Sequence, residues 1–127
     1  MIINFRTFEG YYSSMEIAEN ENYCFITPLS PKLDSRESTG ILDILTNVNK
    51  NLKIGINLEY VQECSIEFIE TIKKFSENRS IGIFNIPPEI FILFNICKLD
   101  KIIDLYNLQC DFEDKKHKLI NRNFSVI

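Results

Sequence analysis

The residues whose types could carry out chemistry gather between positions 63 and 70, around the expected start of a helix. Cys64 and Ser65 precede the first apolar residues of helical spacing, and Glu63, Glu67 and Glu70 flank them. A thiolate is stabilised and made reactive at a helix N-terminus, where a serine hydroxyl can also cap the helix. Cys64 is therefore either a reactive thiol or a small buried hydrophobe, since free cysteines commonly pack in cores.

No catalytic set accompanies these residues. His117 is the only histidine, and neither a Cys nor an acidic pair stands near it at metal-ligand spacing. The glutamates have no identifiable partner carboxylate, the four cysteines form no C-x-x-C pair, and the four glycines are too scattered for a phosphate loop. We therefore expect no enzymatic activity, no cofactor and no metal.

Composition excludes further classes of partner. The 127 residues carry 14 basic against 18 acidic side chains, a net charge of -4, which disfavours a nucleic-acid surface. The one basic cluster, Lys115, Lys116 and Lys118, is interleaved with Asp114 and His117 and is typical of a solvated helix face. No apolar run approaches the roughly 20 residues that cross a bilayer, and the N-terminus lacks a secretory pattern. We expect a cytoplasmic protein with reduced thiols and no membrane insertion.

The elements that must position residues 63–70 follow from hydrophobic periodicity and turn chemistry. A hairpin opens the domain, and strands then alternate with helices, which predicts an α/β fold with a largely parallel sheet. Asp34 and Ser35 offer oxygens to the first helix, and Ser65 can cap the second. The expected strands are residues 14–18, 23–29, 53–58, 80–86 and 101–106, and the expected helices are residues 36–49, a segment after Ser65, and residues 89–98, followed by a mixed segment 108–120.

Three strings in this order resemble the STAS domain, the family of bacterial anti-sigma factor antagonists and of modules in sulfate transporters. Residues 30–39 read SPKLDSREST, residues 56–72 read INLEYVQECSIEFIETI, and residues 85–106 read NIPPEIFILFNICKLDKIIDLY. The resemblance covers about residues 14–115. It implies a mixed, mostly parallel sheet of four to five strands packed with about four helices, and a role in binding regulatory proteins.

The resemblance also locates the switch of the antagonists, a serine phosphorylated by a partner kinase. An ungapped comparison places Ser65 on the Asp that precedes that serine, and Ile66 on the serine itself. Ile66 cannot accept a phosphate, so we expect no switching of the usual kind. Ser65 is a possible alternative phosphosite because the positive end of the helix dipole would stabilise a phosphate there. The competing interpretation is a simple N-cap.

The third expected helix is apolar around most of its circumference. Phe91 and Ile92 project off the stripe that should face the core. Either the N-terminal extension covers this second surface with its aromatic residues, or a partner covers it. Phe91 and Ile92 are therefore a possible dimer or docking face. The aromatic residues in question are Phe5, Phe8, Tyr11 and Tyr12.

These observations predict a STAS-like domain over residues 14–120, an N-terminal extension over 1–13 and a tail over 121–127. The predicted function is non-enzymatic signalling by partner switching, in regulation of transcription, with a serine-kinase-type anti-sigma factor or another regulatory protein as partner. The alternative is a small-molecule or lipid-binding module, or a subunit that regulates a transporter. The predicted partner-binding residues are Asp34, Ser35, Glu63, Ser65, Ile66, Glu67 and Glu70.

Overall fold

The computed structural model describes the backbone of residues 4–9 and 14–119 and the side chains of residues 15–119. Its elements alternate between strand and helix after an initial run of strands. In chain order they are β1 (Asn4–Glu9), β2 (Ser14–Glu19), β3 (Tyr23–Pro28), β4 (Lys32–Leu33), α1 (Ser35–Asn47), β5 (Lys53–Asn57), β6 (Glu63–Cys64), α2 (Ile66–Ser76), β7 (Ile81–Phe84), α3 (Pro88–Ile96), the 3₁₀ turn η1 (Leu99–Lys101), β8 (Asp104–Leu105) and α4 (Gln109–Asp114).

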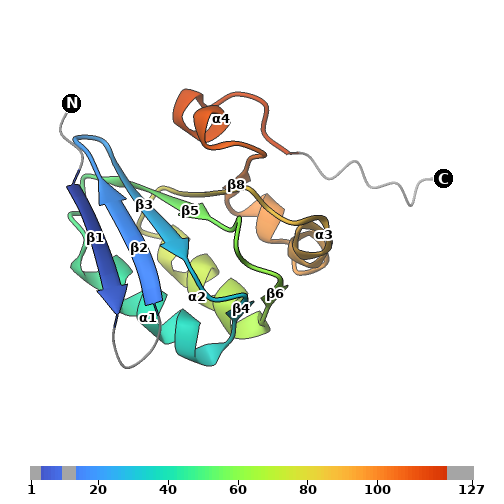
Figure 1. The fold of residues 1–127 in the computed structure, drawn as a ribbon. Helices are drawn as coiled ribbons and strands as arrows, with labels where there is room; N and C mark the ends of the chain where they lie inside the picture. The colour runs from blue at the N-terminus through green and yellow to red at the C-terminus, as the bar shows by residue number, and fades with distance from the viewer. Residues whose placement is uncertain (1–3, 10–13, 120–127) are drawn as a thin grey trace.

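The main sheet has the strand order β1-β2-β3-β5-β7-β8. The pairs β1–β2 and β2–β3 are antiparallel, whereas β3–β5, β5–β7 and β7–β8 are parallel (Figure 1). The predicted α/β fold with a mixed, mostly parallel sheet and four helices is thereby confirmed. Strands β2, β3, β5, β7 and β8 supply the four to five strands expected within residues 14–120, and residues 4–9 of the extension add β1 as an edge strand.

The opening hairpin forms where turn chemistry was expected. The Asn20 side-chain oxygen accepts hydrogen bonds from the backbone N–H groups of Asn22 and Tyr23, both at 2.8 Å, and so closes the turn between β2 and β3. Strand β3 ends at Pro28, which has no N–H to extend the ladder. The hairpin therefore sets the register that places Thr27 opposite Glu16.

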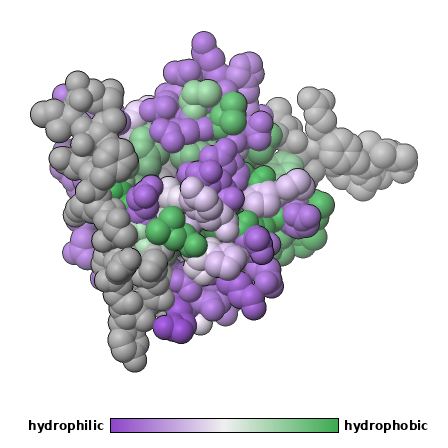
Figure 2. All heavy atoms as spheres, in the orientation of Figure 1, coloured by the Kyte–Doolittle hydropathy of each residue, from purple (hydrophilic) through white to green (hydrophobic). Residues whose placement is uncertain are grey.

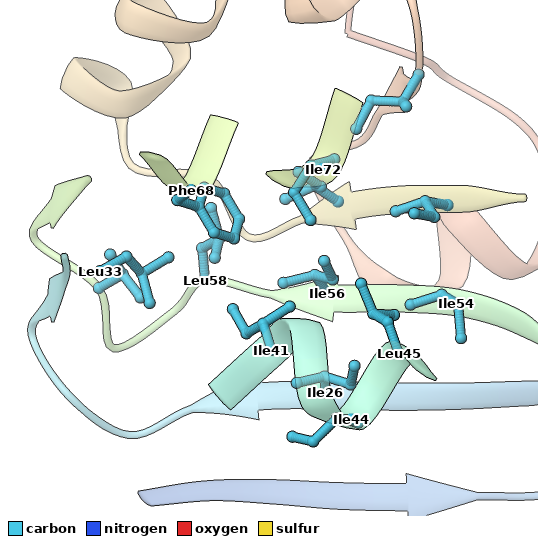
Figure 3. Close-up of a cluster of buried hydrophobic side chains, with 14 of the residues drawn as sticks. Ile26, Leu33, Ile41, Ile44, Leu45, Ile54, Ile56, Leu58, Phe68 and Ile72 are labelled. Atoms are coloured by element: carbon cyan, nitrogen blue, oxygen red, sulfur yellow. The ribbon is translucent and has the colours of Figure 1, made fainter. Parts of the chain in front are cut away.

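The two faces of the sheet are packed differently. On one face Ile26, Ile54, Ile56 and Ile83 are fully buried beneath α1 and α2, which lie side by side (Figures 1 and 3). Each such side chain contributes about 1.5–3 kcal/mol by leaving water, so this layer is the main source of stability. Because side chains alternate along a strand, their neighbours point to the opposite face.

The opposite face carries an aromatic cluster under α4. Phe25, Phe84, Tyr106 and Phe112 are all buried there, with Phe112 donated by α4. Figure 1 shows α4 on the side of the sheet away from α1 and α2. The centroids of the Phe112 and Phe84 rings are 5.8 Å apart, and those of Phe112 and Phe25 are 6.0 Å apart. This cluster anchors the C-terminal helix to the sheet.

The C-terminal third differs from the sequence-based expectation in two places. The strand expected over residues 101–106 is only Asp104–Leu105, because Leu99–Lys101 turns as a 3₁₀ helix instead. Helix α4 ends at Asp114, and Lys115 and His117 have φ angles of 55° and 58°. The basic cluster and His117 are exposed as expected, but they follow the helix and do not form one of its faces.

Helix α3 lies near the β8 side of the sheet, and β1 forms the opposite edge (Figure 1). The expectation that the N-terminal extension covers α3 is therefore wrong for residues 4–9, because edge pairing with β2 carries them away from it. Tyr11 and Tyr12 lie outside the described residues. None of the helices in the described part of the chain is both long and apolar enough to span a bilayer.

Candidate functional site

Two short strands bring the starts of α1 and α2 together. Strand β4 pairs in parallel with β6, so that Leu33 lies opposite Cys64. The N–H of Ser65 donates to the carbonyl oxygen of Leu33 at 2.8 Å, and the N–H of Gln62 donates to the carbonyl oxygen of Pro31 at 2.7 Å. Because a helix follows each strand at once, the two helices begin next to each other at one corner of the molecule (Figure 1).

Side-chain caps begin both helices at this corner. The Asp34 carboxylate accepts hydrogen bonds from the N–H groups of Arg36 at 3.0 Å and Glu37 at 3.4 Å. The Ser65 hydroxyl oxygen accepts one from the N–H of Phe68 at 3.4 Å. Both residues are therefore N-caps, as their positions before the apolar helical spacing predicted. The cap role of Ser65 is the interpretation that competes with a phosphosite.

The corner is hollowed and carries both signs of charge. A depression of about 290 Å³ is lined by β4, β6 and the two cap residues. Across it, Lys32 Nζ lies 3.9 Å from Glu63 Oε2, with both side chains largely exposed. An exposed pair of this kind contributes little to stability, about 0–1 kcal/mol. Lys32 was missed by the sequence reasoning because only the β4–β6 pairing brings it beside Glu63.

The structure places most of the predicted partner-binding residues on this corner. Ile66, the first residue of α2, is a large apolar side chain with an exposed fraction of 53%. Ser35 and Glu67 are exposed in the first turns of the two helices. Glu70 is exposed one turn further along α2, where its Oε2 lies 3.7 Å from Lys73 Nζ. We use "the α1–α2 corner" for Asp34, Ser35, Glu63, Ser65, Ile66, Glu67 and Glu70.

The corner stands on a rigid base. Leu33, Leu58 and Phe68 lie directly beneath it and are essentially inaccessible to solvent (Figure 3). Phe68 also stacks on Phe94 of α3, with ring centroids 6.3 Å apart. A surface whose supporting side chains are packed in this way keeps its shape without a partner, which favours recognition of a preformed surface.

Cys64 does not have the properties of a reactive thiol. Burial, together with a smaller effect of nearby Cys97, raises the pKa of its thiol to about 12. The nucleophile is the thiolate, and a thiol with such a pKa is almost entirely protonated at neutral pH. Of the two interpretations of Cys64, the structure favours the buried hydrophobe, which packs against the main core.

The possible dimer or docking face on α3 is only partly exposed. Phe91 is half-buried against the main core, whereas Ile92 has an exposed fraction of 58%. Ile96, one turn after Ile92, is 71% exposed and was not singled out from the sequence. Figure 2 shows hydrophobic surface on the side of the molecule where α3 lies.

A polar network that the sequence did not reveal closes the carboxyl ends of β5 and β7. The Asn85 amide donates to Asn57 Oδ1 at 2.9 Å, and the Asn57 amide donates to Glu59 Oε1 at 2.9 Å. Asn85 adopts a φ of 56°, a conformation that asparagine tolerates better than most residues. Asn57 and Asn85 are 28 positions apart and meet only because β5 pairs in parallel with β7, so no local sequence pattern predicts their contact.

Comparison with known proteins adds no relative to this description. Neither a scan against protein-family models nor a search of curated proteins returns a match for the chain.

Proposed function

We propose that this chain is a non-enzymatic regulatory module that docks a partner protein through the α1–α2 corner. The observation that carries the proposal is Ile66, an isoleucine exposed by 53% at the start of a helix that buries Phe68, Ile69 and Ile72. Exposed apolar residues surrounded by polar ones are typical of protein interfaces, where a few such anchors supply most of the binding energy.

The charge around Ile66 indicates the chemistry of the partner. Glu63, Glu67 and Glu70 are all exposed, with Lys32 beside Glu63 and Lys73 beside Glu70. A surface of this kind is complemented by an apolar pocket bordered by Lys or Arg side chains. A stable complex would bury on the order of 1,600 Å² in total, more than the corner alone offers. The partner would therefore also touch the adjoining loops.

The resemblance to STAS domains supports a particular partner class. Anti-sigma factors of the serine-kinase type bind antagonists of that family at the turn before the second helix, and this turn is the α1–α2 corner here. Ile66 takes the position of the phosphorylated serine, so we propose binding that a kinase does not reverse. The chain would act in the cytoplasm, either as a constitutive antagonist or as a scaffold in regulation of transcription.

Titration of the chain with a serine-kinase-type anti-sigma factor from the same genome, followed by calorimetry, tests this proposal. Ile66→Arg should weaken binding at least about tenfold, because it removes the anchor and places a cation against basic residues. Leu42→Arg is the matched control, since Leu42 is 40% exposed on α1, away from the corner, and its replacement should leave the affinity unchanged.

Two results would contradict the proposal. One is equal affinity of the Ile66→Arg and Leu42→Arg variants, which would place the interface elsewhere. The other is release of the partner when ATP is added, accompanied by a phosphate on Ser65 by mass spectrometry, which would make the chain a switched antagonist with a displaced phosphosite.

A further inference from the structure

A groove of about 350 Å³ lies on the α4 side of the sheet, remote from the α1–α2 corner. Its walls come from β2, from the carboxyl ends of β3 and β5, and from α4 (Figure 1). Helix α4 packs over β5 and β7, and its Phe112 also reaches Phe25 of β3, so the groove lies between α4 and the β2–β3 hairpin. Its volume falls within the usual range for small-ligand sites, about 300–1,000 Å³.

The groove is lined by acidic side chains from three separate elements. Glu16 comes from β2, Glu59 from the loop after β5, and Glu113 from α4, and no Lys or Arg is among the lining residues that the structure describes. Negative charge gathered in a concave site attracts cations. The carboxylates do not converge on one point, since the described residues contain no group of three acidic, His or Cys side chains that could hold a metal ion. The arrangement suits a cation whose charges are spread along its length.

A second, independent observation points to a ligand. Thr27 lines the groove and is only 9% exposed, yet its hydroxyl has no hydrogen-bond partner in the part of the chain that the structure describes. The Thr27 oxygen is not one of the fully buried, unpaired polar atoms of the described residues, so it is accessible from the groove and can bond a ligand there. Thr27 lies directly across from Glu16 in the β2–β3 ladder, and both residues line the groove.

The base of the groove combines an apolar surface with a fixed polar group. The Phe25 ring lines it and is held by the aromatic cluster, and the 9% of this residue that stays exposed gives an apolar contact for methylene groups. Beside it Asn57, 8% exposed, is fixed by its hydrogen bonds to Glu59 and Asn85. Carboxylates spaced along an aromatic base match a chain of methylenes with ammonium groups.

We propose that this groove binds a small linear polyamine, with Glu16, Glu59 and Glu113 facing its ammonium groups, Thr27 accepting a hydrogen bond from one of them, and Phe25 contacting its methylene chain. The site is independent of the α1–α2 corner, so it neither requires nor excludes the proposed docking function.

Calorimetric titration of the full chain with spermidine tests the site, with amide chemical shifts as a second readout. We expect saturable one-to-one binding that weakens as salt rises, with the largest shifts at the amides of Thr27 and Asn57. The double variant Glu16→Gln/Glu113→Gln should lose at least about tenfold in affinity, because each charge-assisted hydrogen bond is worth roughly that factor. Thr27→Val should weaken binding severalfold with little change in shape.

The matched control is Asp43→Asn/Glu77→Gln, which changes the net charge equally at exposed positions on the α1 and α2 side. It should bind spermidine as the wild type does. Circular dichroism melts establish that each variant is folded. The proposal would be overturned by equal losses in the two double variants, by unchanged affinity of Thr27→Val, by absence of binding at millimolar spermidine, or by tighter binding of a lysine-rich peptide than of spermidine at this groove.

Discussion

The backbone N–H of Ser65 donates a 2.8 Å hydrogen bond to the carbonyl oxygen of Leu33. This single contact ties the segment before α2 to the segment before α1, although the two residues are 32 positions apart. The cap residues of both helices, Asp34 and Ser65, are therefore held beside each other on a buried base. The surface proposed for partner binding exists because of this pairing.

The two caps should contribute unequally to stability. Asp34→Ala should lower the free energy of unfolding by about 1 kcal/mol, because two N–H groups of α1 lose their acceptor. Asp43→Ala, at an exposed position of the same helix, should cost much less. Ser65→Ala should cost less than Asp34→Ala, since its one hydrogen bond is long, and Ser65→Asp should restore the cap. Urea denaturation measures all four, and a larger loss for Asp43→Ala than for Asp34→Ala would refute the assignment.

Gly82 should tolerate no side chain. A Cβ there would lie 2.5 Å from the Phe112 ring, and Gly82 is buried between strands, so the ring cannot move without disturbing the aromatic cluster. Gly82→Ala should destabilise the protein by about 1–3 kcal/mol. In a double-mutant cycle with Phe112→Leu, the combined loss should be smaller than the sum of the single losses, because the smaller side chain relieves the clash. Additive losses would show that Phe112 does not limit the space.

Arg79 should hold the C-terminal end of α1. Its guanidinium donates to the carbonyl oxygens of Leu45, Val48, Asn49 and Leu52 at 2.6–3.2 Å. Arg79→Met keeps the apolar stem but leaves these acceptors without their donor, so the free energy of unfolding should fall by about 1.5–3 kcal/mol. Lys116→Met, which removes an equal charge from an exposed position, should have almost no effect. Thermal melts with equal midpoints for both variants would contradict this role.

The Cys64 thiol should be unreactive in the native protein. Because burial raises its pKa from 9.0 to about 12, the folded chain keeps this proton where the unfolded chain loses it. The contribution of Cys64 to stability is therefore complete below pH 9 and is lost as the pH rises from 9 towards 12. With iodoacetamide at pH 8, exposed Cys110 should react at least about tenfold faster than Cys64, and the difference should vanish in urea. Rapid native labelling of Cys64 would be the contrary result.

The extent to which the sequence predicted the fold depended on how local each signal was. The hairpin, the two caps and the strand at Lys53–Asn57 were predictable because turn residues, cap residues and apolar spacing act within a few positions. Strands β4 and β6 were not predictable from the sequence. Each has only two residues, too few to show periodicity, and each is a strand only because it pairs with the other. The length of β8 was overestimated because Ile102 and Ile103 are residue types common in strands. The chain instead forms a 3₁₀ turn at Leu99–Lys101, and only Asp104–Leu105 pairs as a strand.

The amino-acid sequence by itself determined the fold class and the positions of Asp34 and Ser65 just before two helices. These depend on residue types and short spacings. The tertiary structure alone decided that Lys32 meets Glu63, that Phe112 lies over Gly82, and that Glu16 and Thr27 share a groove with Glu113. Such contacts join elements that are distant along the chain. They depend on the strand order of the sheet and on helix packing, and no local sequence pattern encodes either of these.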